Sequence, residues 1–415
     1  MRDQLPVRDG LPVRDGTRPS PAGVYVHFPW CLAKCPYCDF VSYVTPTIDH
    51  AGYADAVLRE MDARTPSFEG RAVESVFFGG GTPSLWEPRE LGRVLDGVRR
   101  QLGAGERTEV TVECNPTSLD PERARALFDV GVNRLSIGVQ SLTDDRLRFL
   151  GRLHDAAGAR AAVLGALSAG MPRVSADLIF GLPDQSPEEA RREALELADL
   201  GIAHLSAYQL TIEPGTRFGE LARRGRLPLA DDGLVADSFL AIDEALGARG
   251  FRHYEISNHA RAGEEARHNL GYWRGDEYLG LGCGAYGFAR EALPAGDAAT
   301  ASEASGAVQG VRWRNEVVPE RYVKGDARAA ASREPLDGET LLRERIMLGL
   351  RMDEGIDLDA IALELRVPAW TPERRRAAAW LEERGRIERS GEGGSRIRIP
   401  RSAWLWTDDT AARLF

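Results

Sequence analysis

Residues 24–40 read VYVHFPWCLAKCPYCDF, in which a short β-branched and aromatic run is followed at once by three cysteines. Cys31, Cys35 and Cys38 have C-x-x-x-C-x-x-C spacing, and thiolates are ligands of zinc, copper(I) and iron–sulfur clusters. A structural zinc takes four protein ligands, and no fourth Cys or His follows nearby. Three thiolates instead suit a 4Fe–4S cluster whose fourth iron stays open to a small molecule. The alternative, buried or disulfide-bonded cysteines, is disfavoured because disulfide frameworks are typical of small secreted chains.

The composition excludes several classes of protein. The chain has 415 residues, enough for two domains, and a formal net charge of −10, so no overall basic field attracts nucleic acid or an anionic membrane. No stretch reaches the roughly 18–20 apolar residues that a transmembrane helix needs, and the first residues contain no apolar run of a signal peptide. We therefore expect a cytoplasmic protein with no transmembrane segment and no nucleic-acid partner. We expect the other two cysteines, Cys114 and Cys283, to be buried apolar residues.

Residues 21–290 alternate between short apolar or β-branched runs and longer helical segments. The predicted strands are 24–28, 75–78, 109–114, 134–139, 174–180 and 204–210, and the predicted helices include 86–101, 121–130, 156–169 and 187–199. Six βα units predict an α/β fold with a parallel sheet, helices over it and right-handed crossovers. Because six units fall short of a full eightfold barrel, we expect a partial, open (βα)6 TIM-like barrel.

The remaining segments differ in composition. Residues 1–20 repeat LPVRDG and are expected to form a disordered leader. Residues 291–334 begin with a low-complexity run and are expected to form a flexible insertion and connector. Residues 335–415 have helical patterns at 340–351 and 371–384 and then two short β-like runs around glycines, which predicts a small winged-helix-like domain. Its arginines and acids are nearly equal in number, which favours a docking module over a DNA-binding one.

Polar or glycine-rich motifs follow each predicted strand, and the GGGTP run at residues 79–83 follows the second. In parallel βα folds the carboxyl ends of the strands form the active-site face, so these motifs are expected to line one pocket. Glu113, Gln140, Arg152 and Asp177 lie at or near strand ends, where burial is costly unless polar groups are paired or hold a ligand. The alternative is an internal ion pair, for example between Arg152 and Asp177.

The cysteine run resembles the cluster loop of the radical SAM enzymes, in which S-adenosylmethionine (SAM) chelates the fourth iron. Together, YVHFPWC, GGGTP, VECNP, GVNRLSIGVQS, LGRLHD and DLIFGLP resemble the family of oxygen-independent coproporphyrinogen III oxidases and their relatives, the HemW-type haem chaperones. The resemblance covers residues 22–290 densely and implies a radical SAM barrel followed by a HemN-like winged-helix domain. It implies a 4Fe–4S cluster on the three cysteines and SAM contacts from Tyr25, Tyr37, Gly80, Gly81, Thr82, Glu113, Gln140, Arg152 and Asp177.

Two features separate the branches of this family. The oxidases carry a further cysteine two residues after the third, where this chain has Phe40, and the chaperones carry an H-N-x-x-Y-W motif, matched here by HNLGYW. Histidine is a common axial ligand of haem iron, and tyrosine can be one. The resemblance therefore implies haem contacts from His268, Tyr272 and Trp273. Tyr286 departs from the family, which usually has histidine there.

The implied function is that of a HemW-type haem chaperone, which binds a 4Fe–4S cluster, SAM and haem and delivers haem to haem-requiring apoproteins such as respiratory enzymes. The alternative is an oxygen-independent coproporphyrinogen III oxidase, which performs radical SAM oxidative decarboxylation in porphyrin biosynthesis. Whether the chain is an enzyme stays open, although Phe40 and HNLGYW disfavour oxidase activity. A nucleic-acid-modifying radical SAM protein is disfavoured because no basic aromatic stripe is present. The sequence names neither the haem acceptor nor the axial ligand, and it leaves a homodimer open.

Overall fold

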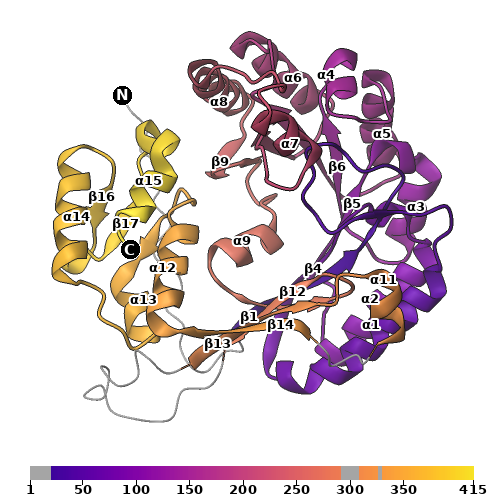
Figure 1. The fold of residues 1–415 in the computed structure, drawn as a ribbon, viewed down its shortest axis with the longest axis horizontal. Helices are drawn as coiled ribbons and strands as arrows, with labels where there is room; N and C mark the ends of the chain where they lie inside the picture. The colour runs from indigo at the N-terminus through magenta and orange to yellow at the C-terminus, as the bar shows by residue number, and fades with distance from the viewer. Residues whose placement is uncertain (1–19, 291–307, 326–329) are drawn as a thin grey trace.

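The computed structural model describes residues 20–290, 308–325 and 330–415. Its main element is a curved sheet with helices along its convex side (Figure 1). Within the described residues the strand order is β14-β13-β12-β11-β1-β4-β5-β6-β7-β8-β10-β9. The strands from β11 to β8 run parallel, and those at both edges are antiparallel. Because β14 and β9 do not pair with each other, the barrel is open, as expected from six βα units.

The main sheet contains each of the six predicted parallel strands. Its strands are β1 (Ser20–Phe28), β4 (Arg71–Gly80), β5 (Glu109–Cys114), β6 (Arg134–Gln140), β7 (Arg173–Phe180), β8 (His204–Gln209), β9 (Arg252–Glu255), β10 (Asn258–Ala260), β11 (Glu277–Leu281), β12 (Tyr286–Arg290), β13 (Val308–Asn315) and β14 (Ala330–Asp337). A separate parallel pair, β2 (Trp30–Cys31) and β3 (Tyr43–Val44), brackets the cysteine loop. The partial barrel predicted from the sequence is therefore confirmed.

Helices connect the parallel strands and cover their outer face (Figure 1). They are α1 (His50–Arg64), α2 (Pro88–Leu102), α3 (Pro121–Asp129), α4 (Asp144–Phe149), α5 (Ala156–Ser168), α6 (Pro187–Asp199), α7 (Arg217–Arg223) and α8 (Asp232–Ala248), with 3-10 turns at Thr65–Phe68, Pro83–Leu85 and Pro116–Ser118. Their starts follow from the sequence. Side chains of Asp120, Asp155, Ser186 and Asp231 cap the N-termini of α3, α5, α6 and α8. Proline in the first turn of α2, α3 and α6 already has the φ angle that a helix needs.

The two faces of the parallel sheet differ in chemistry. Alternate residues of a strand point to opposite faces, and Val24, Val26 and Phe28 of β1 are fully buried in the core under the helices. The concave face carries small and polar residues instead, such as Ser175 and Asp177 of β7, which line a cavity. A parallel sheet usually has apolar residues on both faces, so a polar concave face indicates a site for a ligand.

Two segments depart from what the sequence predicts. Residues 308–324, which the sequence places in a flexible connector, form β13 and α11 (Pro319–Lys324), because Val311 and Trp313 alternate with polar residues and Trp313 is buried on the sheet. Helix α9 (Arg267–Trp273) lies in the hollow against β1 and β4, where no helix was predicted (Figure 1). The predicted leader, apart from Ser20, and residues 291–307 of the predicted insertion lie outside the described residues.

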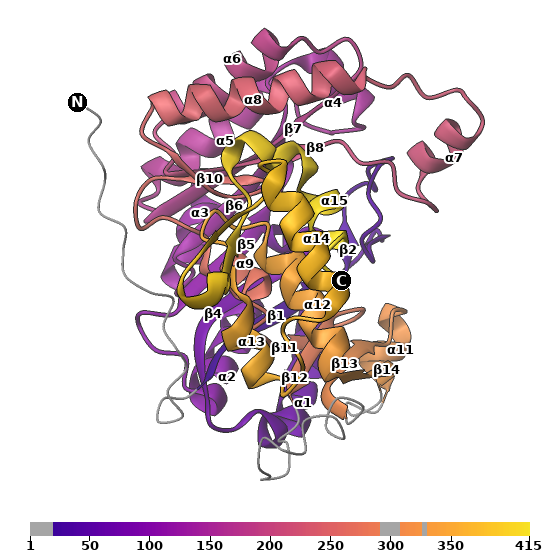
Figure 2. The same ribbon diagram turned by 90° about the vertical axis from the view of Figure 1, so that its left-hand side faces the viewer.

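The C-terminal region forms a second domain with its own core. Its elements are α12 (Gly338–Gly349), β15 (Ile356–Asp357), α13 (Leu358–Glu364), α14 (Pro372–Glu383), β16 (Glu388–Ser390), β17 (Arg396–Arg398), α15 (Thr407–Ala412) and 3-10 turns at Glu392–Gly394 and Arg401–Trp406. The domain contains a helix, a strand, two helices and a hairpin, and its strand order is β15-β17-β16. This is the winged-helix arrangement that was predicted. The domain stands against the open side of the barrel (Figure 2). No helix in the described ranges is both long and apolar enough to cross a bilayer.

One buried arginine holds this domain together and gives a test of its stability. Arg374 is only 1% exposed, and it donates to the carbonyl oxygens of Leu414, Pro368 and Ala369 and to the carboxylate of Glu339. Arg374→Met would leave these acceptors without a donor, so we expect the free energy of unfolding to fall by about 3 kcal/mol. Urea unfolding, monitored by tryptophan fluorescence, measures this loss.

A matched control is Arg376→Met on the same helix, because Arg376 is 70% exposed and pairs only with Glu373. That variant should unfold within about 0.5 kcal/mol of wild type. Equal stability of the two variants would show that Arg374 does not organise the domain.

Candidate functional site

A cavity of about 1130 Å³ lies at the carboxyl ends of the parallel strands, between the barrel and the C-terminal domain. The strand ends, the cysteine loop, the start of α8 and residues 404–409 contribute its walls. The predicted site residues that line it are Cys31, Cys35, Tyr37, Cys38, Gly80, Gly81, Thr82, Glu113, Gln140, Arg152 and Asp177. Tyr25 lies behind this wall, where its hydroxyl bonds to His27 Nδ1 at 2.9 Å.

The cysteine loop presents three free thiols to the cavity. Its ends are fixed by the β2–β3 pair and by a 2.7 Å contact between His27 Nε2 and the carbonyl oxygen of Val41. Burial raises the pKa of both Cys31 and Cys38. Thiols of raised pKa stay protonated until a metal displaces the proton, so this loop is suited to ligation more than to nucleophilic attack.

Two donors reach the sulfur atoms. Thr82 Oγ1 lies 3.4 Å from Cys31 Sγ, and Arg152 Nη1 lies 3.3 Å from Cys35 Sγ. In the described part of the chain, the sulfur atoms of Cys31, Cys35 and Cys38 do not all lie within 4.8 Å of one another. This wider spacing suits a cluster, in which each thiolate binds a different iron, better than a single ion. The donor set therefore fits a 4Fe–4S group.

The glycine-rich motif joins the cysteine loop to the sheet. The backbone N–H groups of Gly81 and Thr82 donate to the carbonyl oxygens of Phe28 and Trp30 at 2.7 and 2.8 Å. A Cβ atom on Gly81 would lie 2.7 Å from the Trp30 oxygen, and one on Gly80, whose φ is +109°, would lie 2.4 Å from the His27 ring. Only glycine allows this close approach, so the motif sets the position of the thiols.

Two carboxylates face the cavity, and in the described ranges neither forms an ion pair with a cationic side chain. Burial, with the nearby Asp177, raises the pKa of Glu113 to about 8, although its carboxylate accepts a hydrogen bond from the Gly80 N–H at 3.0 Å. Burial raises the pKa of Asp177 to about 6, and Ser136 Oγ donates to it at 3.1 Å. The Arg152–Asp177 ion pair, the alternative to a ligand site, is not formed, because Arg152 donates to Cys35 and to the carbonyl oxygen of Gly138. Two carboxylates in this state can accept hydrogen bonds from ribose hydroxyls or from an ammonium group.

Gln140 is held in a strained backbone conformation at the same strand ends. Its φ is +67°, and the pairing of β6 with β7 shifts register between Ile137 and Gln140. A positive φ in a residue other than glycine costs on the order of 1–2 kcal/mol, and such strain is concentrated at functional sites. The strain places the Gln140 side chain on the cavity wall.

The HNLGYW segment does not line the large cavity, except through Asn269. His268 is 3% exposed, and its ring stacks on Phe77. Its Nδ1 lies 2.9 Å from Ser75 Oγ, and its Nε2 lies 3.1 Å from the Tyr272 hydroxyl. Both ring nitrogens therefore have partners inside the hollow, and His268 would reach a haem iron only after a movement of α9.

Sequence reasoning missed part of the cavity wall. Arg134, Ser136 and Ser206 line it from within predicted strands, Arg134 at the first position of its strand, and their alternation with buried apolar neighbours was the available signal. Trp404 and Trp406 of the C-terminal domain also line it. No pattern in the sequence indicates this contact, because it depends on how the two domains dock.

Comparisons with known proteins agree with this geometry. The chain matches the family model of the radical SAM superfamily over residues 25–198 and that of the HemN C-terminal domain over residues 336–406. It is similar to the heme chaperone HemW of Escherichia coli, with 42% identity over 268 residues that cover 64% of this chain and 70% of that protein. It is also similar to the heme chaperone HemW of Mycobacterium tuberculosis, with 33% identity over 370 residues and 88% of each chain covered.

Among solved structures, coproporphyrinogen III oxidase (HemN) from Escherichia coli, described as a radical SAM enzyme, superposes with a TM-score of 0.76. The match covers 95% of this chain and 90% of that one at 22% identity. At this identity the likeness concerns the fold alone.

The raised pKa of Glu113 predicts a pH-dependent stability. The folded chain binds this proton more tightly than the unfolded chain, so the free energy of unfolding falls as the pH rises from the ordinary 4.5 through about 8. The Glu113→Gln side chain keeps an acceptor for Gly80 but has no proton to lose. We expect the cluster-free variant to be more stable than wild type by on the order of 4 kcal/mol near pH 8.5, and by less than about 1 kcal/mol near pH 5.

Urea unfolding at the two pH values measures this difference. The control is Glu122→Gln, whose side chain is exposed on α3. It should leave stability unchanged at both values, and an equally flat result for Glu113→Gln would contradict the raised pKa.

Proposed function

We propose a function for this chain from one premise: it belongs to the heme chaperone HemW family within the radical SAM superfamily. On that premise the chain is a cytoplasmic haem chaperone that carries a 4Fe–4S cluster, binds SAM and delivers haem to haem-requiring apoproteins such as respiratory enzymes. One observation carries the proposal. Three free thiols, a glycine-rich strand end and two unpaired carboxylates share one cavity in a chain that matches HemW proteins over most of its length.

In this proposal the thiols of Cys31, Cys35 and Cys38 hold the cluster. The cluster, when bound, supplies an open iron for SAM and, when reduced, an electron. Arg152 stabilises the negative charge on Cys35, from which its Nη1 lies 3.3 Å away, and Thr82 donates to Cys31. These donors favour the thiolate form that ligation requires.

The SAM contacts are proposed for the residues around the carboxylates. Glu113 and Asp177 accept hydrogen bonds from the ligand, and a cationic ligand returns their raised pKa values toward the ordinary range. Gly80 and Gly81 leave room for close backbone approach. The other proposed contacts are Tyr25, Tyr37, Thr82, Gln140 and Arg152.

Haem binding is the step that rests on the family alone. His268, Tyr272 and Trp273 remain candidates for haem contact, but His268 is enclosed between Ser75 and Tyr272 and would need α9 to turn outward first. Phe40, which stands where the oxidases have cysteine, is 58% exposed beside the cavity. An exposed aromatic there supports a chaperone over a coproporphyrinogen oxidase, because the further cysteine that the oxidases carry at this position is missing.

The cluster assignment predicts the metal content of the chain. Anaerobic reconstitution should give about four irons and four sulfides per chain, and Cys35→Ala should lose them because each thiolate holds a different iron. Iron and sulfide analysis measures this. Cys114→Ala and Cys283→Ala are matched controls, since both thiols are buried and neither belongs to the cysteine loop, and they should keep the cluster. Full cluster content in Cys35→Ala would sink the assignment.

The chaperone assignment predicts haem binding without oxidase activity. Haem added to the reconstituted chain should show a Soret band that is shifted from that of free haem. We expect His268→Ala to keep that shift, because both imidazole nitrogens are already engaged in the hollow. A lost shift in this variant would identify His268 as the iron ligand and show that α9 opens.

An activity assay of the reconstituted chain distinguishes a haem chaperone from a coproporphyrinogen oxidase. With SAM and a reductant, coproporphyrinogen should remain unconverted. Conversion to protoporphyrinogen would overturn the chaperone assignment in favour of the oxidase.

A further inference from the structure

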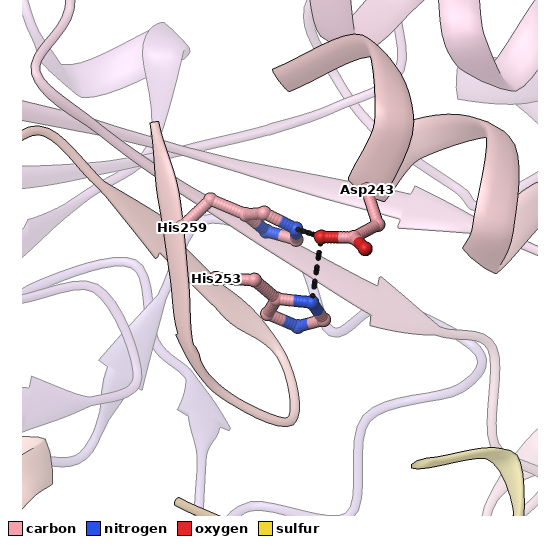
Figure 3. A group of neighbouring side chains, drawn as sticks. All are labelled: Asp243, His253 and His259. Carbon is pink, nitrogen blue, oxygen red and sulfur yellow. Dashed lines mark hydrogen bonds and ion pairs between the residues drawn. The ribbon is translucent and has the colours of Figure 1, made fainter. Parts of the chain in front are cut away.

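A second group of ligating side chains lies outside the large cavity. Asp243 of α8, His253 of β9 and His259 of β10 bring one ligand atom each to within 4.8 Å of the others (Figure 3). His253 and His259 are cross-strand partners in the β9–β10 hairpin, which explains why their rings stack with centroids 3.8 Å apart. We call these three residues the His–His–Asp cluster. None of them lines the cavity described above.

The spacing of the three atoms is that of a metal site. His253 Nδ1 and His259 Nε2 lie 3.1 and 3.6 Å from the same oxygen of Asp243 (Figure 3). Ligands at 2.0–2.1 Å from a tetrahedral zinc are about 3.3 Å from one another. The two observed distances lie on either side of this value, so little movement is needed to admit an ion.

The hydrogen-bond partners of His253 are compatible with an ion on Nδ1. Its Nδ1 faces the Asp243 carboxylate at 3.1 Å, and its Nε2 faces the carbonyl oxygen of Ile256 at 3.1 Å. Both partners are acceptors, so they are satisfied either by a ring with an N–H on each nitrogen or by a ring with a metal on Nδ1 and an N–H on Nε2. With a metal on Nδ1, the N–H on Nε2 donates to Ile256, which is the usual outer contact of a ligating histidine.

His259 gives an independent observation. It is 2% exposed, and among the residues that the structure describes neither of its ring nitrogens has a hydrogen-bond partner. The 3.6 Å contact with Asp243 is too long for a hydrogen bond. A buried imidazole without partners is costly, and a turn of this ring toward Asp243 breaks no hydrogen bond.

We propose that the His–His–Asp cluster is a binding site for a divalent transition ion of the zinc class. Two imidazoles and one carboxylate suit Zn²⁺ and its neighbours, whereas Ca²⁺ and Mg²⁺ prefer oxygen ligands. Three protein ligands leave a fourth position, and the Asp243 side chain is 22% exposed, so that position is open to solvent on its side.

The site also meets the C-terminal domain. Arg401 Nη1 lies 3.3 Å from the Asp243 oxygen that the histidines face, and Arg401 Nη2 donates to the carbonyl oxygen of His253. The Trp404 ring packs edge-on against the His253 ring, with 4.4 Å between the ring centroids. The guanidinium and a metal ion compete for one carboxylate, so ion binding weakens a contact between the barrel and the C-terminal domain.

Metal titration of the full chain tests the proposal. Cys31, Cys35 and Cys38 are first changed to alanine, so that thiolates take no ion and the result does not depend on the proposed cluster. We expect about one Zn²⁺ per chain by equilibrium dialysis and metal analysis. Co²⁺ in the same site should give the visible absorption of a four-coordinate ion without thiolate charge-transfer bands.

Further substitutions in the triple-alanine chain identify the residues that bind the ion. His259→Phe, which keeps the stacked ring, and Asp243→Asn should each weaken Zn²⁺ binding at least about tenfold. Arg401→Ala should strengthen it, because the competing cation is gone. His50→Gln, at the start of α1 and outside the cluster, should change nothing.

If the triple-alanine chain binds no Zn²⁺, the proposal is overturned. An unchanged Zn²⁺ affinity in Asp243→Asn would also overturn it. If His259→Phe does not fold, Asp243→Asn alone decides, since its amide preserves the size of a partly exposed carboxylate.

Discussion

The backbone contact between the end of β1 and the end of β4 is the constraint on which the candidate site depends. Phe28 pairs with Gly80 in the sheet, and the next two N–H groups along the glycine motif donate to the carbonyl oxygens of Phe28 and Trp30. These bonds attach the cysteine loop to a parallel sheet with a fully buried outer face. Because the attachment uses backbone atoms, the loop gains a fixed position while its three thiols stay free for a ligand. Any side chain at Gly81 would separate the loop from the sheet.

The interior of the barrel has an unbalanced distribution of charge. Glu113 and Asp177 face the cavity with raised pKa values, while the guanidinium of Arg152 is turned to Cys35 and Gly138. Within the cavity walls a cation thus lies beside the thiols, and two carboxyl groups of raised pKa lie on β5 and β7, with β6 between them. A ligand that carries positive charge at one end and reaches the thiol loop with the other matches this arrangement, which is the reason that the carboxylates are tolerated.

The sequence predicted the barrel because its strands carry strong local signals. The helix expected at residues 187–199 has these bounds in the structure, since Ser186 and Pro187 mark its start. The motif residues meet in one cavity because parallel strands end at the same edge. The sequence did not predict β9 and β10, which have four and three residues, or α9, because its HNLGYW run was interpreted only as a haem motif. The tryptophans at 404 and 406 could not be assigned to the cavity, because contacts between domains have no local pattern.

The cavity has one further property, which concerns the separation of its walls along the chain. Its walls combine the loop at residues 31–40 with residues 404–409, which lie at opposite ends of the described chain. Contacts of such large sequence separation close the longest loops, which carries the largest cost in chain entropy. The barrel strands are joined by local crossovers and have a core of their own. The thiol loop is therefore enclosed by a contact between two domains that have separate cores, so separating the domains leaves the core of the barrel intact.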